Sequence, residues 1–131
     1  MTALISGESA YMAVNVELVL PQVQASRAPA LAVTGKRRLA ALPDVPTMGE
    51  AGLAGVDAST WFGLFAPAAT PKDVVDRLQR DAASALRTLK ESFAKQGDEA
   101  IGSTPDEFAT HVRAEHAKWG KVIKDLGVKI D

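Results

Sequence analysis

The sequence contains no cysteine and only two histidines among its 131 residues. Without cysteine, the chain can form no disulfide and has no thiol for nucleophilic catalysis or metal binding. His111 and His116 are separated by about 140° around a helix, so one helix face cannot present both to a metal ion. The His-Glu-x-x-His pattern of zinc sites is also missing. We therefore expect neither a metal site nor a cofactor.

An excess of charge of one sign is missing as well. The chain has 15 basic and 16 acidic residues and a formal net charge of −1, which gives no support for nucleic acid as a partner. No apolar run reaches the length of about 18 residues that a membrane-spanning helix needs. The N-terminus lacks a basic region and is interrupted by Glu8, so it does not have the pattern of a secretory signal.

Patterns typical of enzymes are missing too. Gly49, Gly52 and Gly55 lie at three-residue intervals, which matches neither the dinucleotide-binding nor the P-loop pattern. The serines have no nucleophile-elbow context. A small hydrolase or isomerase is therefore the weakest of the functional hypotheses, and we predict that the chain is not an enzyme.

The stretch from Leu42 to Thr70 organises the chain. Prolines 43 and 46 make an extended connector, and Thr47 with Glu50 has the spacing of a capping box that starts a short helix ended by Gly52. Residues 56–66 are predicted to form one long strand that contains Trp61 and Phe62, ended by Pro67. Thr70-Pro71 then has the pattern of a second helix start.

Elements on both sides of this stretch predict a mixed α/β protein. Residues 10–15 and 28–34 are short apolar strands around a helix at 18–25, which is a βαβ unit and favours a parallel sheet. The spacing of apolar residues predicts helices at 71–89 and 104–126. The second starts at Thr104-Pro105 and ends at Gly127, before an extended tail at 128–131. The basic run Lys36-Arg37-Arg38 is interpreted as a solvated loop rather than a phosphate site.

Three blocks carry a resemblance to a known family: LAVTGKRRLAALPDVPTMGEAGL, STWFGLFAPAATP and HAKWGKVIKDLGVKID. They resemble the C-terminal part of the tripartite tricarboxylate transporter receptors, the Bug-type or TctC-like periplasmic solute-binding proteins. The resemblance covers nearly the whole chain. Such receptors are about twice this length or more, so the remainder of the first lobe and the export signal would lie outside this sequence.

The resemblance implies the C-terminal part of a type II periplasmic-binding-protein fold, in which two α/β lobes are joined by crossing strands. Residues 1–57 would end the second lobe as a βαβ unit and connector. Residues 58–131 would supply a hinge strand and the C-terminal helices that complete the first lobe. The implied function is capture of a small carboxylate in the periplasm and its delivery to membrane permease subunits, without covalent chemistry.

Asn15, Val16 and Glu17 are the best candidates for ligand contact. They lie where a predicted parallel strand passes into a helix, a position at which side chains and free N–H groups face the crevice. The matching loop of the resembling receptors often contains Asp-Asn, whereas this chain has Val14-Asn15, so only the amide matches. A helix-capping role for Asn15 is the alternative. Trp61 either lines the cleft or, like Phe62, packs in the core or hinge, and Trp119 is interpreted as packing.

Two functional hypotheses remain open. The chain is either the truncated portion of a solute receptor with a partial binding wall, or a structural and interaction fragment that binds no solute. In the second case, uncovered strand edges and apolar faces would drive homo-oligomerisation.

Overall fold

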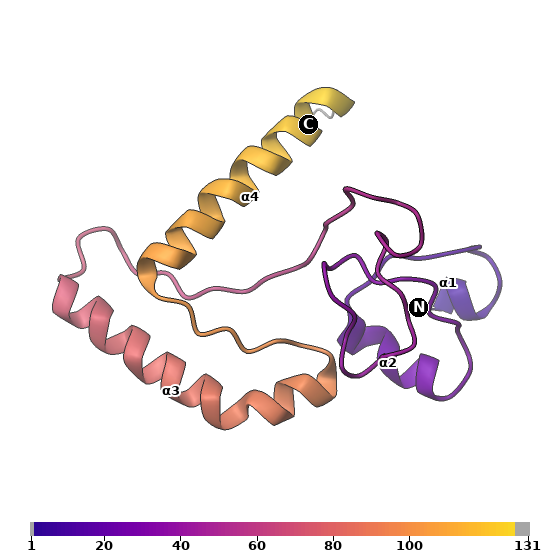
Figure 1. Ribbon diagram of the computed structural model, residues 1–131, viewed down its shortest axis with the longest axis horizontal. Helices are drawn as coiled ribbons and strands as arrows, with labels where there is room; N and C mark the ends of the chain where they lie inside the picture. The colour runs from indigo at the N-terminus through magenta and orange to yellow at the C-terminus, as the bar shows by residue number, and fades with distance from the viewer. Residues whose placement is uncertain (1, 128–131) are drawn as a thin grey trace. The chain divides into compact units, whose positions relative to one another are not determined.

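A computed structural model describes residues 2–127 of the chain. Its helices are α1 (Thr2–Ile5), α2 (Val16–Gln24), α3 (Lys72–Gln96) and α4 (Pro105–Leu126) (Figure 1). Helix is therefore the predominant regular structure of the described residues. The predicted tail at residues 128–131 lies outside the described residues.

The three predicted strands, at 10–15, 28–34 and 56–66, are wrong for this chain. Within residues 2–127, β-pairing is limited to one isolated parallel bridge between Val33 and Thr47. It consists of the Val33 N–H donating to the Pro46 carbonyl and the Met48 N–H donating to the Val33 carbonyl, each at 2.9 Å. A strand exists only where a neighbour supplies a ladder of hydrogen bonds, and within the described residues these segments have no such ladder.

The chain divides into two compact units. The first contains the described residues up to Phe62 together with Arg87–Ala100, and the second contains Gly63–Leu86 with the described chain from Ile101 onward. α1 and α2 lie in the first unit and α4 in the second, whereas α3 contributes residues to both. Each unit is described below by itself.

α3 is one continuous helix of 25 residues, so it continues beyond the predicted end at residue 89. The helix ends in a Schellman motif, in which Gly97 N–H donates to the Ala94 carbonyl and Asp98 N–H to the Phe93 carbonyl. Gly97 has φ +90°, a left-handed conformation that costs glycine nothing.

α4 begins with a capping box at the predicted start. The Thr104 hydroxyl accepts from the Glu107 N–H at 3.3 Å, and the Glu107 carboxylate accepts from the Thr104 N–H at 2.8 Å. Pro105 occupies the first turn and Gly127 is the left-handed cap at the other end. The start at Thr104-Pro105 and the end at Gly127 were predicted, because a helix boundary depends on residues that are close in sequence.

The apolar stripe of α4 is only partly covered. Trp119 is 40% exposed and Leu126 is 72% exposed, so the interpretation of Trp119 as a packed residue is wrong for the described residues. The Trp119 indole N–H donates to the Glu115 carboxylate at 2.9 Å. At the other end of the stripe, Phe108 contacts the ring of Phe65, with 5.3 Å between the ring centroids.

The cores of both units are small. Leu20 and Ala28 are the buried apolar residues of the first unit, and Ala83 is that of the second. Thr47 is the buried polar residue, at 8% exposure. It forms the predicted box with Glu50 (Glu50 N–H to Thr47 Oγ1, 3.1 Å), but residues 48–52 form turns instead of the predicted short helix.

Candidate functional site

The candidate site begins at the N-terminus of α2. Asn15 is the residue before the helix, with extended backbone angles (φ −64°, ψ 142°), but its side chain makes no capping hydrogen bond. Its amide oxygen instead accepts a hydrogen bond from the Thr60 hydroxyl at 3.1 Å. The predicted capping alternative is therefore wrong for the side chain, which links the start of α2 to the segment before Trp61.

Val16 packs against the end of α3. A Cβ atom on Gly97 would lie 2.6 Å from one Val16 methyl carbon and 2.9 Å from the other. The Val16 side chain thus fills the space that a side chain at position 97 would need. Val16 therefore fixes the start of α2, and its contribution to a ligand would come from its backbone N–H group, since the first N–H groups of a helix have no intrahelical partner.

Glu17 is exposed in the first turn of α2. Burial raises the pKa of the nearby Asp98 carboxyl, and the negative charge of Glu17 raises this pKa further. Glu17 also borders a hollow of about 190 Å³. Residue 21 is a proline inside the helix, so it offers no N–H to the Glu17 carbonyl. The hollow is lined by one acidic residue, Glu17, and one basic residue, Lys95.

Trp61 is half-buried and lies outside any strand. It directly follows Thr60, whose hydroxyl contacts Asn15, so the structure brings the segment of Trp61 to the start of α2. The predicted residues therefore gather in one region of the first unit, although the strand that was expected to carry Trp61 is missing.

The sequence reasoning missed Thr60. This residue belongs to the crossing segment, defined here as residues 57–61. Ala58 in this segment exchanges two hydrogen bonds with Thr34, one from the Ala58 N–H and one from the Thr34 hydroxyl, each at 3.3 Å. The segment therefore passes the ends of both apolar segments that precede Asn15 and Gly35. The run Asp-Ala-Ser-Thr before Trp61, which contains three polar residues, was the feature of the sequence that could have indicated a role for Thr60.

A second hollow, of about 430 Å³, lies beside the crossing segment. Its lining residues are Gly35, Lys36, Thr47, Gly49, Gly55, Val56 and Asp57. The Lys36 ammonium lies 3.6 Å from the Asp57 carboxylate, and the Ser59 hydroxyl donates to the same carboxylate at 3.2 Å. The two charged residues that line this hollow are therefore paired with each other.

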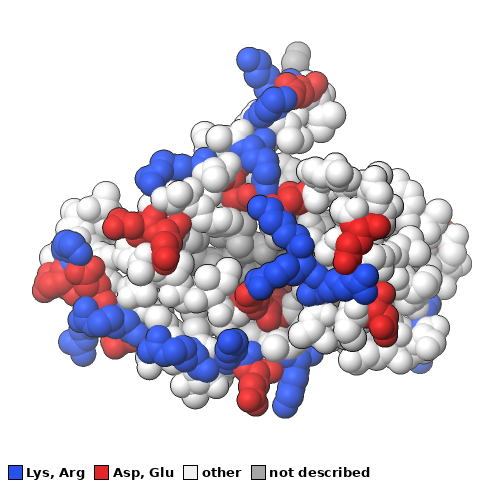
Figure 2. Space-filling model, viewed as in Figure 1, with Lys and Arg blue, Asp and Glu red and all other residues white. Residues whose placement is uncertain are grey.

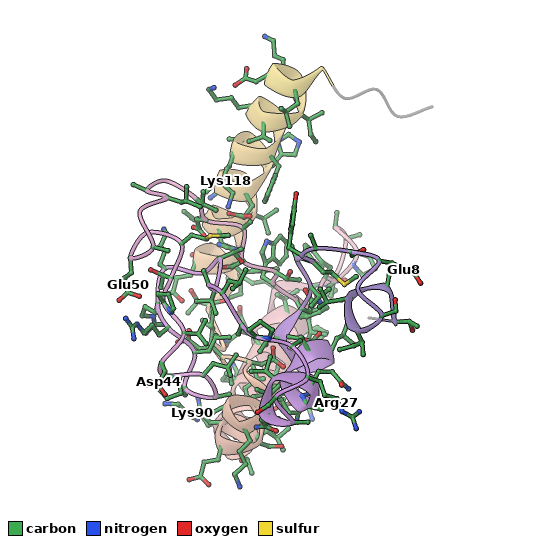
Figure 3. The ribbon with its side chains drawn as sticks, turned by 90° about the vertical axis from the view of Figure 1, so that its right-hand side faces the viewer. Glu8, Arg27, Asp44, Glu50, Lys90 and Lys118 are labelled. Atoms are coloured by element: carbon green, nitrogen blue, oxygen red, sulfur yellow. The ribbon has the colours of Figure 1, made fainter. Side chains whose placement is uncertain are left out.

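The basic run beside this hollow is neutralised within the first unit. Lys36 pairs with Asp57, Arg37 with Glu99 at 2.6 Å, and Arg38 with Glu50 at 2.9 Å. Figure 3 labels Glu50 on its loop, and Figure 2 shows red and blue side chains interleaved on the visible face. The Arg38 guanidinium, followed by the Thr47 N–H, lowers the pKa of Glu50. The run therefore ties loops together, in agreement with its interpretation as a solvated loop.

Two kinds of site are missing from residues 2–127. These residues contain no group of three or more His, Cys, Asp or Glu side chains placed to hold a metal ion. None of their helices combines the length and the apolar character needed to cross a membrane. The region around Asn15 offers hydrogen-bond donors and acceptors for a small polar molecule.

Known proteins are similar to almost the whole chain. The sequence matches the tripartite tricarboxylate transporter family receptor over residues 1–128. It is 35% identical over 123 residues to the UPF0065 protein in the tcbD-tcbE intergenic region of Pseudomonas sp. strain P51, covering 92% of this chain and 37% of that protein. It is 32% identical over 118 residues to protein BugT of Bordetella pertussis, covering 88% of this chain and 36% of that protein.

A solved structure described as that of a periplasmic transporter superposes on the chain with a TM-score of 0.85 at 32% sequence identity. It covers 99% of this chain, which in turn covers 44% of the solved chain. The chain thus spans a little over a third of the length of these curated relatives, 37% and 36%. The match along residues 1–128 shows that the chain belongs to the tripartite tricarboxylate transporter receptor family.

Proposed function

We propose that this chain is part of an extracytoplasmic receptor that captures a small carboxylate solute and passes it to the membrane permease subunits of a transporter. The receptor acts in the periplasm by reversible binding and performs no covalent chemistry. Residues 1–57 end the second lobe, and residues 58–131 supply the hinge segment and the helices that complete the first lobe. Membership of the receptor family supports this proposal.

The observation that carries the proposal is the start of α2. The Asn15 amide, the first N–H groups of the helix and the segment with Trp61 lie together there. N–H groups at the N-terminus of a helix attract an anion, because they lack intrahelical partners and lie at the positive end of the helix dipole. A carboxylate is therefore the group that this position suits best.

The hollow beside Pro21 has lining residues of both charges. Glu17 and Lys95 both line it, and the Asp98 carboxyl near Glu17 has a raised pKa. The proposed contact for the solute carboxylate is the Asn15 amide with the first N–H groups of α2, where an anion is favoured.

A second candidate function is an interaction fragment that oligomerises and binds no solute. The observation in its favour is the exposure of three large apolar side chains within four positions: Phe62 is 84% exposed, Leu64 81% and Phe65 72%. Large exposed apolar side chains in one segment are usually covered by a partner.

A thermal-shift screen of C4–C8 dicarboxylates separates the two candidates. It compares the 131-residue chain with a receptor of the relatives' full length that carries this segment, called the full-length receptor below. A receptor function predicts that at least one dicarboxylate raises the melting temperature of the full-length receptor, because a ligand that binds only the folded state stabilises it. No shift with any dicarboxylate, together with a stable oligomer in size-exclusion chromatography, would favour the interaction fragment.

A further inference from the structure

The turn that follows α3 is packed against the first residue of α2. Gly97 in this turn is buried and has φ +90°, and a Cβ atom at its position would lie 2.6 Å and 2.9 Å from the two methyl carbons of Val16. Carbon atoms that are not bonded to each other prefer separations of about 3.5–4.0 Å. Any residue larger than glycine would therefore displace either the turn or Val16. Both residues belong to the first unit.

The turn is the better fixed of the two partners. The Gly97 N–H donates to the Ala94 carbonyl at 3.2 Å, and the Asp98 N–H donates to the Phe93 carbonyl at 3.0 Å. These hydrogen bonds hold the turn to a helix of 25 residues. Val16 is the first residue of the nine-residue α2 and follows a segment without regular structure. A side chain at position 97 would therefore move Val16 rather than the turn.

Val16 carries one of the N–H groups at which the solute carboxylate is proposed to bind. The Leu18 N–H donates to the Asn15 carbonyl at 3.1 Å, whereas the Val16 and Glu17 N–H groups have no partner within the helix. The positions of these two groups follow that of the Val16 backbone. Because hydrogen bonds of this type have N···O distances of about 2.7–3.2 Å, a displacement of Val16 would weaken the hydrogen bonds that these groups donate to a solute.

We propose that Gly97 is a positioning residue of the solute site, because it allows Val16 to pack on the end of α3 and thereby fixes the first N–H groups of α2. This inference rests on the proposed function and deepens it, since it gives the end of α3 a role in the same site. Gly97 itself need not touch the solute.

Calorimetry of the full-length receptor with succinate and with adipate tests this inference. Gly97→Ala should weaken binding about tenfold or more, the equivalent of about one charge-assisted hydrogen bond. Gly52→Ala is the matched control, since Gly52 has φ +93° and no atom lies within 4 Å of the position of its Cβ. It introduces similar backbone strain without a collision and should keep the affinity of the wild type. Equal affinities of the two alanine variants would overturn the inference.

Removal of the colliding methyl groups distinguishes positioning from a general loss of stability. Val16→Ala removes both of them, so the double variant Val16→Ala/Gly97→Ala should bind more tightly than Gly97→Ala. A double variant that binds no better would overturn the inference. If Gly97→Ala does not fold, Val16→Ala alone decides: it should weaken binding, whereas Val23→Ala, about two turns later in the same helix, should not. Wild-type affinity of Val16→Ala would then overturn the inference.

The amide chemical shifts of Glu17 and Leu18 give a readout that needs no solute. We expect both to change in Gly97→Ala, to stay as in the wild type in Gly52→Ala, and to return toward the wild type when Val16→Ala is added to Gly97→Ala. Unchanged shifts in Gly97→Ala would overturn the inference, whatever binds. If the wild-type receptor binds neither dicarboxylate while the shifts change as expected, the proposed function is contradicted for these solutes and Gly97 has only a structural role.

Discussion

Gly97 meets two structural requirements at once. Its φ of +90° lies in the left-handed region, and a side chain there would collide with Val16 at 2.6 Å. Both requirements serve the candidate site, because Val16 is the first residue of α2 and follows Asn15. A single glycine thus connects the end of α3 to the position of the proposed ligand-contact residues.

The substitution Gly97→Ala should therefore destabilise the chain more than an alanine at another left-handed glycine. Gly52 is the matched control, since it has φ +93° and no atom lies within 4 Å of the position that a Cβ would take there. We expect Gly52→Ala to cost about 1–2 kcal/mol from backbone strain, and Gly97→Ala to cost a further 1–3 kcal/mol or so from overpacking. Urea denaturation measures both, and equal losses would contradict the tight contact with Val16.

Asp98 gives a prediction about pH at the same turn. Its carboxyl has a raised pKa, owing first to burial and then to the charge of Glu17. The folded state therefore favours the protonated form, so the stabilisation linked to Asp98 is present at low pH and is lost as the pH rises through the raised pKa. Asp98→Asn removes the titrating group. The free energy of unfolding of this variant, measured between pH 3 and pH 8, should therefore lack the decrease that Asp98 causes as the pH rises. A variant with the same pH dependence as the wild type would contradict this role of Asp98.

At the scale of elements, the two capping boxes show what a local pattern can specify. Thr104 with Glu107 starts a helix of 22 residues, whereas Thr47 with Glu50 makes the same hydrogen bonds and leads only into turns. The residues after Thr104 continue an apolar stripe at helical spacing. After Thr47, Gly49 and Gly52 interrupt the helical pattern. A capping box therefore starts a helix only where the following residues can continue it.

The box at Thr104 predicts an acid-sensitive start of α4. The Thr104 N–H, and then its hydroxyl, lower the pKa of Glu107. The stabilisation by this carboxylate is therefore present above its unfolded pKa and is lost as the pH falls through the lowered pKa. Glu107→Gln keeps an oxygen acceptor without the charge, so the helicity of α4 should become less dependent on pH between 3 and 6, as measured by circular dichroism. An unchanged acid profile would mean that Glu107 does not control this helix start.

Helices were predictable from the sequence and strands were not, for a physical reason. The boundaries of α4 depend on Thr104, Pro105 and Gly127, which act within one or two turns. A strand such as the one expected at 56–66 depends on a neighbour elsewhere in the chain, and the apolar residues alone do not supply it. The contact of Thr60 with Asn15 was missed for the same reason, since 45 positions separate these residues.

At the scale of the whole molecule, the chain exposes much apolar surface. The segment from Phe62 to Phe65, Leu126 at the end of α4, and Ile101 before it (76% exposed) illustrate this. We predict that the 131-residue chain does not behave as a well-folded monomer at micromolar concentration, because such surface is normally covered. Light scattering coupled to size-exclusion chromatography checks this prediction. A monodisperse monomer with cooperative unfolding would show that each unit is stable with its present core.

The isolated chain would supply only part of the binding site of a two-lobed receptor. A two-lobed receptor holds its solute between two walls, each of which supplies preorganised donors. Losing three charge-assisted hydrogen bonds from one wall removes roughly 4–9 kcal/mol, which is comparable with the total of about 8 kcal/mol for a micromolar complex. We therefore predict no measurable affinity of the 131-residue chain for C4–C8 dicarboxylates. Micromolar binding by this chain would mean that residues 1–131 already contain a complete site.

Calorimetry of the full-length receptor with and without the Asn15→Ala substitution tests the central claim most directly. The claim is that the start of α2 contacts the solute through the Asn15 amide. The dicarboxylate that binds the wild-type receptor should bind the variant about tenfold more weakly, the loss of one neutral hydrogen bond, while the melting temperature without solute changes little. Equal affinities for the wild type and the variant would contradict the claim and place the solute elsewhere.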